Sequence, residues 1–302
     1  MIRISVVIPT WNRPGPLAAC LVALTASFPP DAETIVVSDG GAEDLGPVVA
    51  PFVDPLRLRL LQVEHGGPAA ARNRGLEAAR GEIVAFTDDD CRPHPGWLAA
   101  LVASVILSPP RAVGGSTFNG LPANAYADAT QLVLFLLAAY DRAFTGQERL
   151  LPSNNFAFPA SALIRIGGFD ERFRTAEDRE LCRRWTQAGY TLARVSDAIV
   201  ERDESLDLKS FFGKFFAYGR GAAKFHGSGS SPSLRESMRF HFRLPTLAIP
   251  ELRRRRMARR VAIVALLVLW EIANLAGYIA ERARLAVQGS AAANASADAK
   301  AP

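Results

Sequence analysis

Short apolar segments alternate with helix-like segments through the first 107 residues, and this alternation constrains the fold most. The apolar segments are bounded by Gly, Pro or Asp, as strands buried in a sheet usually are. The expected strands are 4–8, 34–38, 58–63 and 82–87, and the expected helices are 14–27, 68–79 and 96–107. Strands that alternate with helices predict an α/β fold with a mostly parallel sheet and helices on both faces.

Acidic residues follow two of these strands. Asp39 ends the second, and Asp88, Asp89 and Asp90 end the fourth. In a parallel sheet, ligands bind at the carboxyl ends of strands. Adjacent carboxylates repel one another, so a cation is expected beside them. In an extended chain Asp88 and Asp90 point to the same side, roughly 7 Å apart, a spacing that suits a hard divalent cation. An acidic turn that caps the next helix is the alternative.

The charge of the chain is uneven. The net charge of the 302 residues is +5, and a single basic run supplies six positive charges. The run consists of Arg253, Arg254, Arg255, Arg256, Arg259 and Arg260. The rest of the chain therefore carries −1. An apolar stretch follows the run, which favours a membrane surface over nucleic acid as its partner.

The cysteines exclude two classes of protein. Cys20, Cys91 and Cys182 are far apart and odd in number, and no CxxC pair occurs. Neither a zinc site nor a disulfide framework is therefore expected, and a reducing cytosol fits. The first residues also lack the charged, then apolar, then cleavable pattern of a signal peptide.

The C-terminal third is predicted to be helical and apolar. Residues 206–225 carry Phe211, Phe212, Phe215 and Phe216 among lysines, which suits either a helix in a membrane interface or ordinary packing. Residues 261–279 are mostly apolar, a marginal length for a membrane span. They could cross the bilayer, lie along it or pair with another helix. If they cross, the arginines stay cytoplasmic, which places the main domain in the cytoplasm.

Five motifs occur in order along residues 4–225. They read SVVIPTWNRP, VVSDGG, AAARNRGLEAARGEIVAFTDDD, GGFDERF and EDRELCRRWTQAGY. No GxGxxG is present, which argues against a dinucleotide-binding turn. Together the motifs resemble the family 2 glycosyltransferases, inverting enzymes with the Rossmann-like GT-A fold. The resemblance implies a catalytic domain at 1–205. The expected remainder is an amphipathic interfacial region at 206–245, a basic and membrane-associated or single-span segment at 246–287 and a disordered tail at 288–302.

The resemblance implies a donor site for a nucleotide sugar. Pro9, Thr10 and Asn12 would lie beside the base and ribose, and Asp39 would accept a hydrogen bond from the base. Arg72 would be a cationic contact, although a surface arginine on a helix is the alternative.

The aspartate triplet takes the remaining donor roles. Asp88 would contact the ribose or the metal, Asp89 would lie with the nucleotide-sugar contacts, and Asp90 would bind Mg²⁺ or Mn²⁺.

The resemblance also implies an acceptor side. Glu177 and Asp178 match the family's acidic pair, with Asp178 as the general base that deprotonates an acceptor hydroxyl. Thr175 as an N-cap with Asp178 three residues later is the structural alternative. Asn154 and Asn155 would line the acceptor side or else cap a turn.

The chain departs from the family at one expected metal ligand. Many members have a histidine after the last strand, where this chain has Glu201, Arg202 and Asp203. The carboxylate of Glu201 or of Asp203 could replace this histidine, or the metal is held more loosely. His226 follows a helix and is not expected to be a ligand.

Two functions remain open from the sequence. The first is a glycosyltransferase at the cytoplasmic face of the membrane, which moves a sugar to a glycan or lipid-linked acceptor of the cell envelope. The second is a catalytically silent, nucleotide-sugar-binding scaffold subunit. Phosphoryl transfer through a nucleophilic aspartate does not fit, because the triplet follows the fourth strand instead of the first.

Overall fold

The computed structural model describes residues 2–146, 148–227 and 234–298 of the chain. They form two compact units, of which the first comprises Met1–Ala123 and Leu137–Ser205. The second unit comprises Asn124–Leu136 and Leu206–Pro302. The sequence had placed residues 124–136 in the N-terminal domain, whereas the structure groups them with the C-terminal helices.

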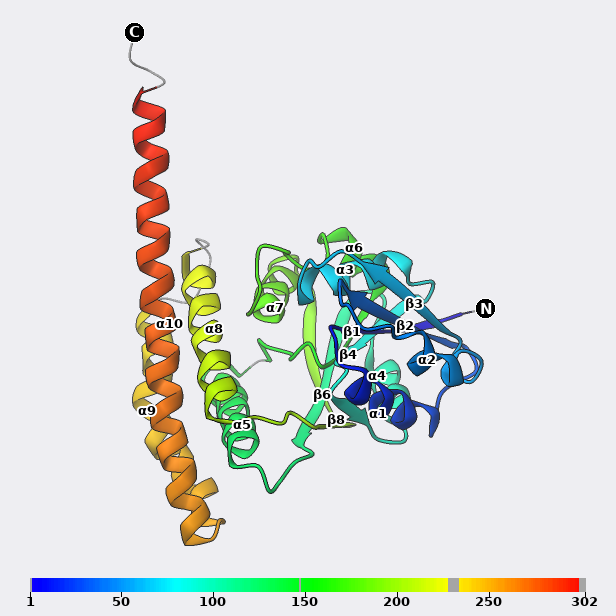
Figure 1. Cartoon of the computed structure of the whole chain (residues 1–302), viewed down its shortest axis with the longest axis horizontal. Coiled ribbons are helices and arrows are strands. Elements are labelled where there is room, and N and C mark those ends of the chain that lie inside the picture. Colours follow the sequence, from blue (N-terminus) through cyan, green and yellow to red (C-terminus); the bar gives the residue numbers. More distant parts are fainter. Residues whose placement is uncertain (1, 147, 228–233, 299–302) are drawn as a thin grey trace. The chain divides into compact units, whose positions relative to one another are not determined.

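An eight-stranded sheet is the framework of the first unit (Figure 1). The strands lie in the order β3-β2-β1-β4-β7-β6-β8-β5. They are β1 Ile4–Thr10, β2 Ala32–Asp39, β3 Leu58–Val63, β4 Ile83–Thr87, β5 Cys91–Pro93, β6 Arg111–Asn119, β7 Asn155–Pro159 and β8 Thr191–Arg202. The first four strands along the chain pair in parallel, and β7 joins β4 antiparallel. The predicted mostly parallel α/β sheet is confirmed.

Helices cover both faces of this sheet (Figure 1). On one face α1 (Pro14–Thr25) and α4 (Trp97–Ser104) pack against alternate residues of β1, among them Val6 and Ile8. On the other, α3 (Pro68–Ala78), α6 (Ala160–Arg165) and α7 (Glu177–Gln187) share a core with Val7. Successive side chains of a strand point to opposite faces. An almost wholly apolar β1 therefore needs helices on both sides, which is why it lies in the interior of a parallel sheet.

Two short helices lie in the first unit, and one long helix is shared between the two units. Helix α2 (Gly46–Val49) and the 3₁₀ helix Ala50–Phe52 connect β2 to β3. Helix α5 (Ala125–Thr145) follows β6, and its first residues belong to the second unit.

Asn155 lies in the core of the first unit, where it ties three elements together. Its side chain is fully buried, and its Oδ1 accepts a hydrogen bond from Trp97 Nε1 at 2.8 Å. Its Nδ2 donates to the carbonyl oxygens of Ser116 and Ala198 at 3.1 and 3.0 Å. Since all its polar atoms serve the scaffold, the structure gives Asn155 a structural role in place of the expected contact with an acceptor.

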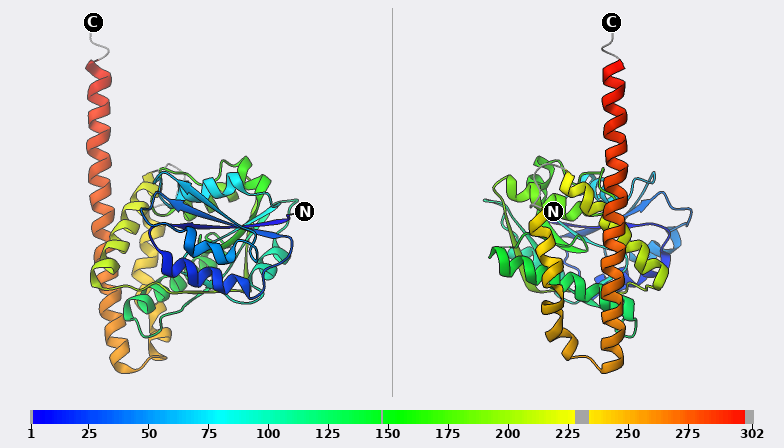
Figure 2. Two further views of the ribbon diagram at one scale, coloured as in Figure 1. Left: turned by 45° about the vertical axis from the view of Figure 1, so that its right-hand side comes forward. Right: turned by 90° about the vertical axis from the view of Figure 1, so that its left-hand side faces the viewer.

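The second unit is helical, and Figure 2 shows its three C-terminal helices side by side. They are α8 (Leu208–Gly227), α9 (Leu234–Arg253) and α10 (Met257–Asp298). Glycines allow α8 and α10 to approach closely, since a Cβ on Gly219 would lie 1.9 Å from the carbonyl oxygen of Asn274, and one on Gly277 1.9 Å from that of Phe216. Such contacts through small residues are typical of tightly packed helix pairs.

Helix α8 carries five phenylalanines, of which Phe211, Phe215 and Phe225 are buried. Phe211 and Phe215 are fully buried, and their rings lie 5.6 Å from Tyr126 and 6.2 Å from Trp270. Phe212 remains partly exposed. Ordinary packing therefore accounts for the apolar face that Phe211 and Phe215 form.

Helix α10 carries an apolar stripe on its outer side. Its large exposed residues recur every three or four positions, the repeat of one helix face. They are Val261, Val264, Val268, Ile272, Leu275 and Ile279. By length and composition, Met257–Gln288 is the one helix among the described residues that could cross a membrane.

The expected disordered tail starts inside this helix. Residues 288–298 continue α10, and residues 299–302 lie outside the described part of the chain. Alanine, which has the highest intrinsic helix propensity, is frequent in this segment.

The environment of Asn155 gives a prediction about stability. Replacing Asn155 by Ala removes its hydrogen bonds with the indole N–H of Trp97, the buried carbonyl of Ala198 and the partly buried carbonyl of Ser116, so we expect a loss of about 3 kcal/mol in the free energy of unfolding. The matched control is Asn154→Ala, because the hydrogen bond between Thr117 and Asn154 is long, at 3.4 Å, and its loss should cost less than about 1 kcal/mol. Urea unfolding measures both. Equal stability of the two variants would contradict the structural role of Asn155.

Candidate active site

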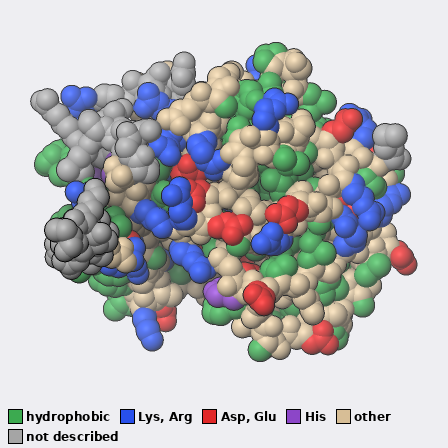
Figure 3. Space-filling view, turned by 90° about the horizontal axis from the view of Figure 1, so that it is seen from above, with side chains coloured by type: hydrophobic (Ala, Val, Ile, Leu, Met, Phe, Trp, Pro, Cys, Tyr) green, Lys and Arg blue, Asp and Glu red, His purple; other side chains and the backbone are tan. Residues whose placement is uncertain are grey.

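The polar site lies where strands of the first unit end. Thr10 ends β1, Asp39 ends β2, the aspartate triplet follows β4 and Arg202 ends β8. This is the edge at which ligands bind in sheets of this kind. Acidic and basic side chains also lie next to one another on the face drawn in Figure 3.

Three arginines compensate the charge of the aspartate triplet. Arg13 contacts Asp89 Oδ1 at 3.0 Å and Asp90 Oδ2 at 3.1 Å. Arg72 contacts Asp88 Oδ1 at 2.7 Å. The Nε of Arg202 lies 3.2 and 3.3 Å from the two oxygens of Asp90. Repulsion between adjacent carboxylates predicted a cation beside them. In the structure, guanidinium groups lie at that place.

Asp89 is held deep in this cluster. It accepts a hydrogen bond from Thr10 Oγ1 at 2.7 Å and is buried. Burial raises the pKa of Asp89 to about 6, although Arg13 and Thr10 oppose the shift. The contacts of Asp89 therefore position Thr10 and Arg13 at the end of β1.

Asp39 organises the loop before α3. Its carboxylate accepts hydrogen bonds from the backbone N–H groups of Gly66 and Gly67 at 2.7 and 2.9 Å, and His65 Nδ1 lies 3.0 Å away. The loop needs glycine there, because Gly67 has a φ of 87° and a Cβ would collide with Arg174. Each carboxylate oxygen has a second lone pair, so Asp39 can still accept a hydrogen bond from a ligand.

An aromatic surface beside Asp39 escaped the sequence analysis. Trp11 is 53% exposed, and its ring centroid lies 5.3 Å from that of His65. A large aromatic residue directly after a strand end was the available signal. Asn12 follows with a φ of 52°, and its Oδ1 accepts the backbone N–H of Glu43 at 3.2 Å. Pro9 is partly buried within β1.

Arg72 joins the triplet to the acidic pair. It is 3% exposed, and its guanidinium contacts Asp88 at 2.7 Å and Glu177 Oε1 at 2.9 Å. The group also lies 5.7 Å from the ring centroid of Phe169. The alternative of a surface arginine is wrong, because Arg72 points inward from α3.

Glu177 and Asp178 open helix α7. The helix begins at Glu177, and Ala176, which has a φ of 65°, holds the N-cap position, so the alternative of Thr175 as the N-cap is wrong. Burial and the neighbouring Asp178 raise the pKa of Glu177 to about 7. Loss of hydration raises the pKa of Asp178 as well, although the backbone N–H of Arg179 donates to its carboxylate at 2.7 Å.

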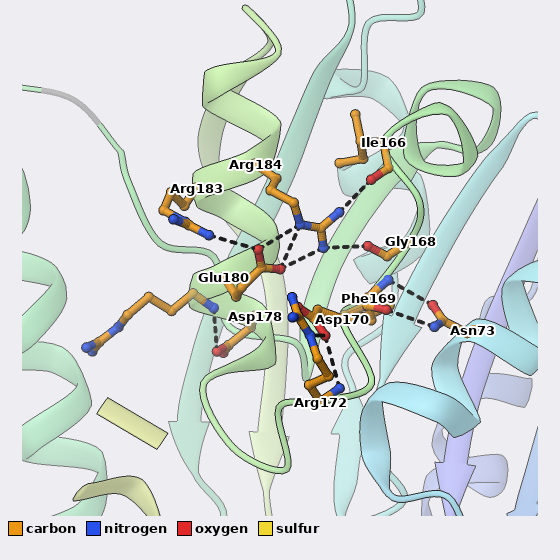
Figure 4. Close-up of polar contacts among 11 residues, drawn as sticks. Asn73, Ile166, Gly168, Phe169, Asp170, Arg172, Asp178, Glu180, Arg183 and Arg184 are labelled. Carbon is orange, nitrogen blue, oxygen red and sulfur yellow. Dashed lines mark hydrogen bonds and ion pairs between the residues drawn. The ribbon is translucent and has the colours of Figure 1, made fainter. Parts of the chain in front are cut away.

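The loop before α7 is fastened on two sides, as Figure 4 shows. Asn73 on α3 donates to the carbonyl of Phe169 at 2.9 Å and accepts its N–H at 2.8 Å. Arg184 on α7 donates to the carbonyls of Ile166 and Gly168 at 2.6 and 2.7 Å. The buried Glu180 orients Arg184 through two contacts of 2.7 and 2.8 Å. These contacts explain why the GGFD and EDRELCRRW motifs occur together.

The end of β8 differs from the expectation for a metal ligand. Arg92 contacts Glu201 at 3.0 Å and Asp203 at 2.6 Å. Arg202 between them is the residue that meets Asp90. His226 belongs to the second unit. Within the described ranges of the chain, no three His, Cys, Asp or Glu residues are grouped so that they could hold a metal ion.

Two carboxylates nevertheless fit a divalent cation. Asp88 and Asp90 already share a cationic group, since Arg202 Nη2 lies 3.8 Å from Asp88 Oδ2 while its Nε contacts Asp90. Carboxylate oxygens are suitable ligands for Mg²⁺ or Mn²⁺. Mg²⁺ is often held by one or two carboxylates, with phosphates and water completing its shell.

Two known proteins illustrate what the chain resembles in sequence. The pre-mycofactocin glycosyltransferase of Mycobacterium tuberculosis is 32% identical over 238 residues, which cover 73% of this chain and 47% of the relative. The glycosyltransferase AglE of Haloferax volcanii is 29% identical, over 65% of both chains. The chain thus spans about half the length of the mycobacterial relative.

A solved structure has the same fold. The mannosyltransferase PcManGT from Pyrobaculum calidifontis, in complex with GDP-Man and Mn²⁺, superposes with a TM-score of 0.62 at 21% identity. The match covers 96% of this chain and 80% of that structure. This likeness shows that the sheet and its helices form a GT-A-like fold.

A match to one protein family covers more than half of the chain. Glycosyl transferase family 2 matches residues 5–173, a range that contains β1, Asp39, Arg72 and the aspartate triplet. The chain belongs to glycosyl transferase family 2.

Proposed function

We propose that this protein transfers a sugar from a nucleotide-diphosphate sugar to an acceptor hydroxyl, with inversion at the anomeric carbon. The observation that carries the proposal is the buried Arg72, which places the aspartate triplet and the acidic pair in one site through contacts of 2.7 and 2.9 Å. A donor site and a general base must be adjacent for such a displacement, because the attacking hydroxyl has to meet the anomeric carbon in line.

The end of β1 and the end of β2 supply the proposed nucleotide site. The exposed Trp11 ring offers a stacking surface for the base. Asp39 accepts a hydrogen bond from the base, and Pro9, Thr10 and Asn12 form the adjoining wall. Backbone N–H groups of the loop fix Asp39, so this acceptor is preorganised.

Asp88 and Asp90 are the proposed ligands of Mg²⁺ or Mn²⁺. When bound, the ion would act as a Lewis acid that stabilises charge developing on the leaving diphosphate. Asp88 also lies within reach of the ribose in this arrangement. Arg13 keeps Asp89 and Asp90 charge-compensated at the same time.

Asp178 is the proposed general base. A base works best when its pKa lies near the working pH, and the pKa of Asp178 is raised. Arg72 neutralises Glu177 beside it, which limits the repulsion within the pair. Asn154, a buried residue directly before β7, is the acceptor contact that remains in the proposal.

The acceptor is proposed to be a glycan or lipid-linked molecule of the cell envelope, reached at the cytoplasmic face of the membrane. The support is the exposed apolar stripe of α10, together with the exposed Arg253, Arg254 and Arg256 at its start. Apolar residues beside arginines favour contact with anionic lipid.

A donor panel tests the transferase. Nucleotide release from UDP-, GDP- and dTDP-sugars should occur with one donor, require Mg²⁺ or Mn²⁺, and fall at least about 100-fold in Asp178→Asn. Asp90→Ala should lose the metal-dependent rate. Arg74→Gln, on the exposed side of α3, is the control and should keep the wild-type rate. Binding of a donor without any release, even with membrane lipid extract added as acceptor, would favour the scaffold subunit instead.

The pH dependence of kcat tests the base. Asp178 accepts a proton only when ionised, so kcat should fall as the pH drops through its raised pKa. The midpoint is expected above the value of about 4 for an ordinary aspartate. Donor affinity must be measured in parallel, because Asp89, with a pKa of about 6, titrates in the same range. A midpoint at or below about 4 would contradict the role of Asp178.

Vesicle binding tests the membrane contact. The full chain should co-sediment with vesicles that contain phosphatidylglycerol, and Val268→Glu with Ile272→Glu should reduce the bound fraction at least about fivefold, because charge on the stripe opposes burial in lipid. Phe118→Glu, an equally exposed apolar residue of β6, is the control. Equal binding of all three proteins would contradict a role of the stripe.

A further inference from the structure

Arg202 contacts the two carboxylates that are proposed to bind the metal. Its Nε lies 3.2 and 3.3 Å from the two oxygens of Asp90, and its Nη2 lies 3.8 Å from Asp88. These are the two carboxylates that could bind Mg²⁺ or Mn²⁺. A guanidinium and a divalent cation repel each other at such distances, so both cannot contact Asp90 as Arg202 does here.

The backbone fixes Arg202 at this place. The N–H of Asp203 donates to the carbonyl of Asp90 at 2.8 Å, which ties the end of β8 to the triplet. Arg202 also pairs in register with Cys91 of β5 and Asn119 of β6. The side chain is therefore delivered to Asp90 by the sheet and not by a mobile loop.

Three arginines face the three aspartates of the triplet, and Arg72 and Arg202 also lie beside Glu177 and Glu204. Asp88, Asp89 and Asp90 carry three negative charges, and Arg13, Arg72 and Arg202 carry three positive ones. A nucleoside diphosphate brings further negative charge to this edge, and a guanidinium binds phosphate oxygens in a bidentate fork. The contacts of Arg202 are the longest of the three, since its nearest carboxylate oxygen lies 3.2 Å away, against 3.0 Å for Arg13 and 2.7 Å for Arg72. Arg202 is therefore the arginine that we expect to change partners.

We propose that Arg202 is an exchangeable counter-ion of the donor site. In the empty enzyme it holds Asp90 and Asp88, and when the donor arrives with its cation it moves from Asp90 to the diphosphate. This inference rests on the proposed function, since it needs a nucleotide-diphosphate donor. One residue would thus both keep the metal out of the empty site and bind the leaving group.

Two binding measurements on Arg202→Gln test the exchange. Without nucleotide, Mn²⁺ binding followed by electron paramagnetic resonance should tighten at least about fivefold, because Asp90 loses one of its competing cations while Arg13 stays. At saturating Mn²⁺, the affinity for GDP or UDP in calorimetry should weaken about tenfold, because the diphosphate loses a guanidinium. These opposite signs are the signature of exchange.

Two further variants separate exchange from a structural role. Arg74→Gln removes an exposed arginine of the same charge and should change neither affinity. Arg202→Lys keeps the charge but not the fork and should give intermediate GDP or UDP affinity. If Arg202 only supports the fold, Arg202→Gln weakens both ligands. A change of the same sign in both measurements, or no change in one of them, overturns the proposal.

Nucleotide binding by the wild-type protein distinguishes failure of the proposed function from failure of the Arg202 exchange. Wild-type protein that binds neither GDP nor UDP with Mn²⁺ would reject the proposed function and the exchange with it. Wild-type binding, together with same-sign changes in Arg202→Gln, would reject the exchange alone and leave the transferase proposal standing.

Discussion

The site depends on one buried guanidinium. Arg72 lies between Asp88, which follows β4, and Glu177, which begins α7, and each contact is shorter than 3 Å. Two acidic clusters from segments about ninety residues apart would otherwise repel each other. Breaking a buried pair of this kind leaves an uncompensated charge in the interior. The two acidic clusters therefore adjoin because of a side chain on α3.

A second set of contacts fixes the loop before α7. Asn73 comes directly after Arg72 on α3 and forms two hydrogen bonds with Phe169, while Arg184 fastens the same loop to α7. Neighbouring residues of one helix thus serve two purposes, compensation of charge and anchoring of the loop. Positioning of this kind, by side chains whose own conformations are fixed, is what a displacement with in-line geometry requires.

Much of the first unit could be predicted from local patterns. The four apolar segments that became β1 to β4 are found, as are the helices α1, α3 and α4. The motif order also led us to expect Asp39, Arg72, the triplet and Glu177 in one site, and in the structure Arg72 contacts both the triplet and Glu177. The sequence analysis missed the partners: Trp11 beside His65, and Arg13 and Arg202 on the triplet. It left Asn155 open between an acceptor contact and a turn cap, because the hydrogen bonds of Asn155 join segments that are distant along the chain.

The sequence by itself determined the strand–helix alternation, because buried parallel strands require continuous apolar runs and the helices between them require their own periodicity. It also determined that carboxylates would gather at one edge of the sheet. Tertiary structure alone decided which cation each carboxylate meets. Arg202 lies more than one hundred residues from Asp90 along the chain, and only the pairing of β8 with β5 and β6 brings them into contact. Register in a sheet is a non-local property, so no motif records it.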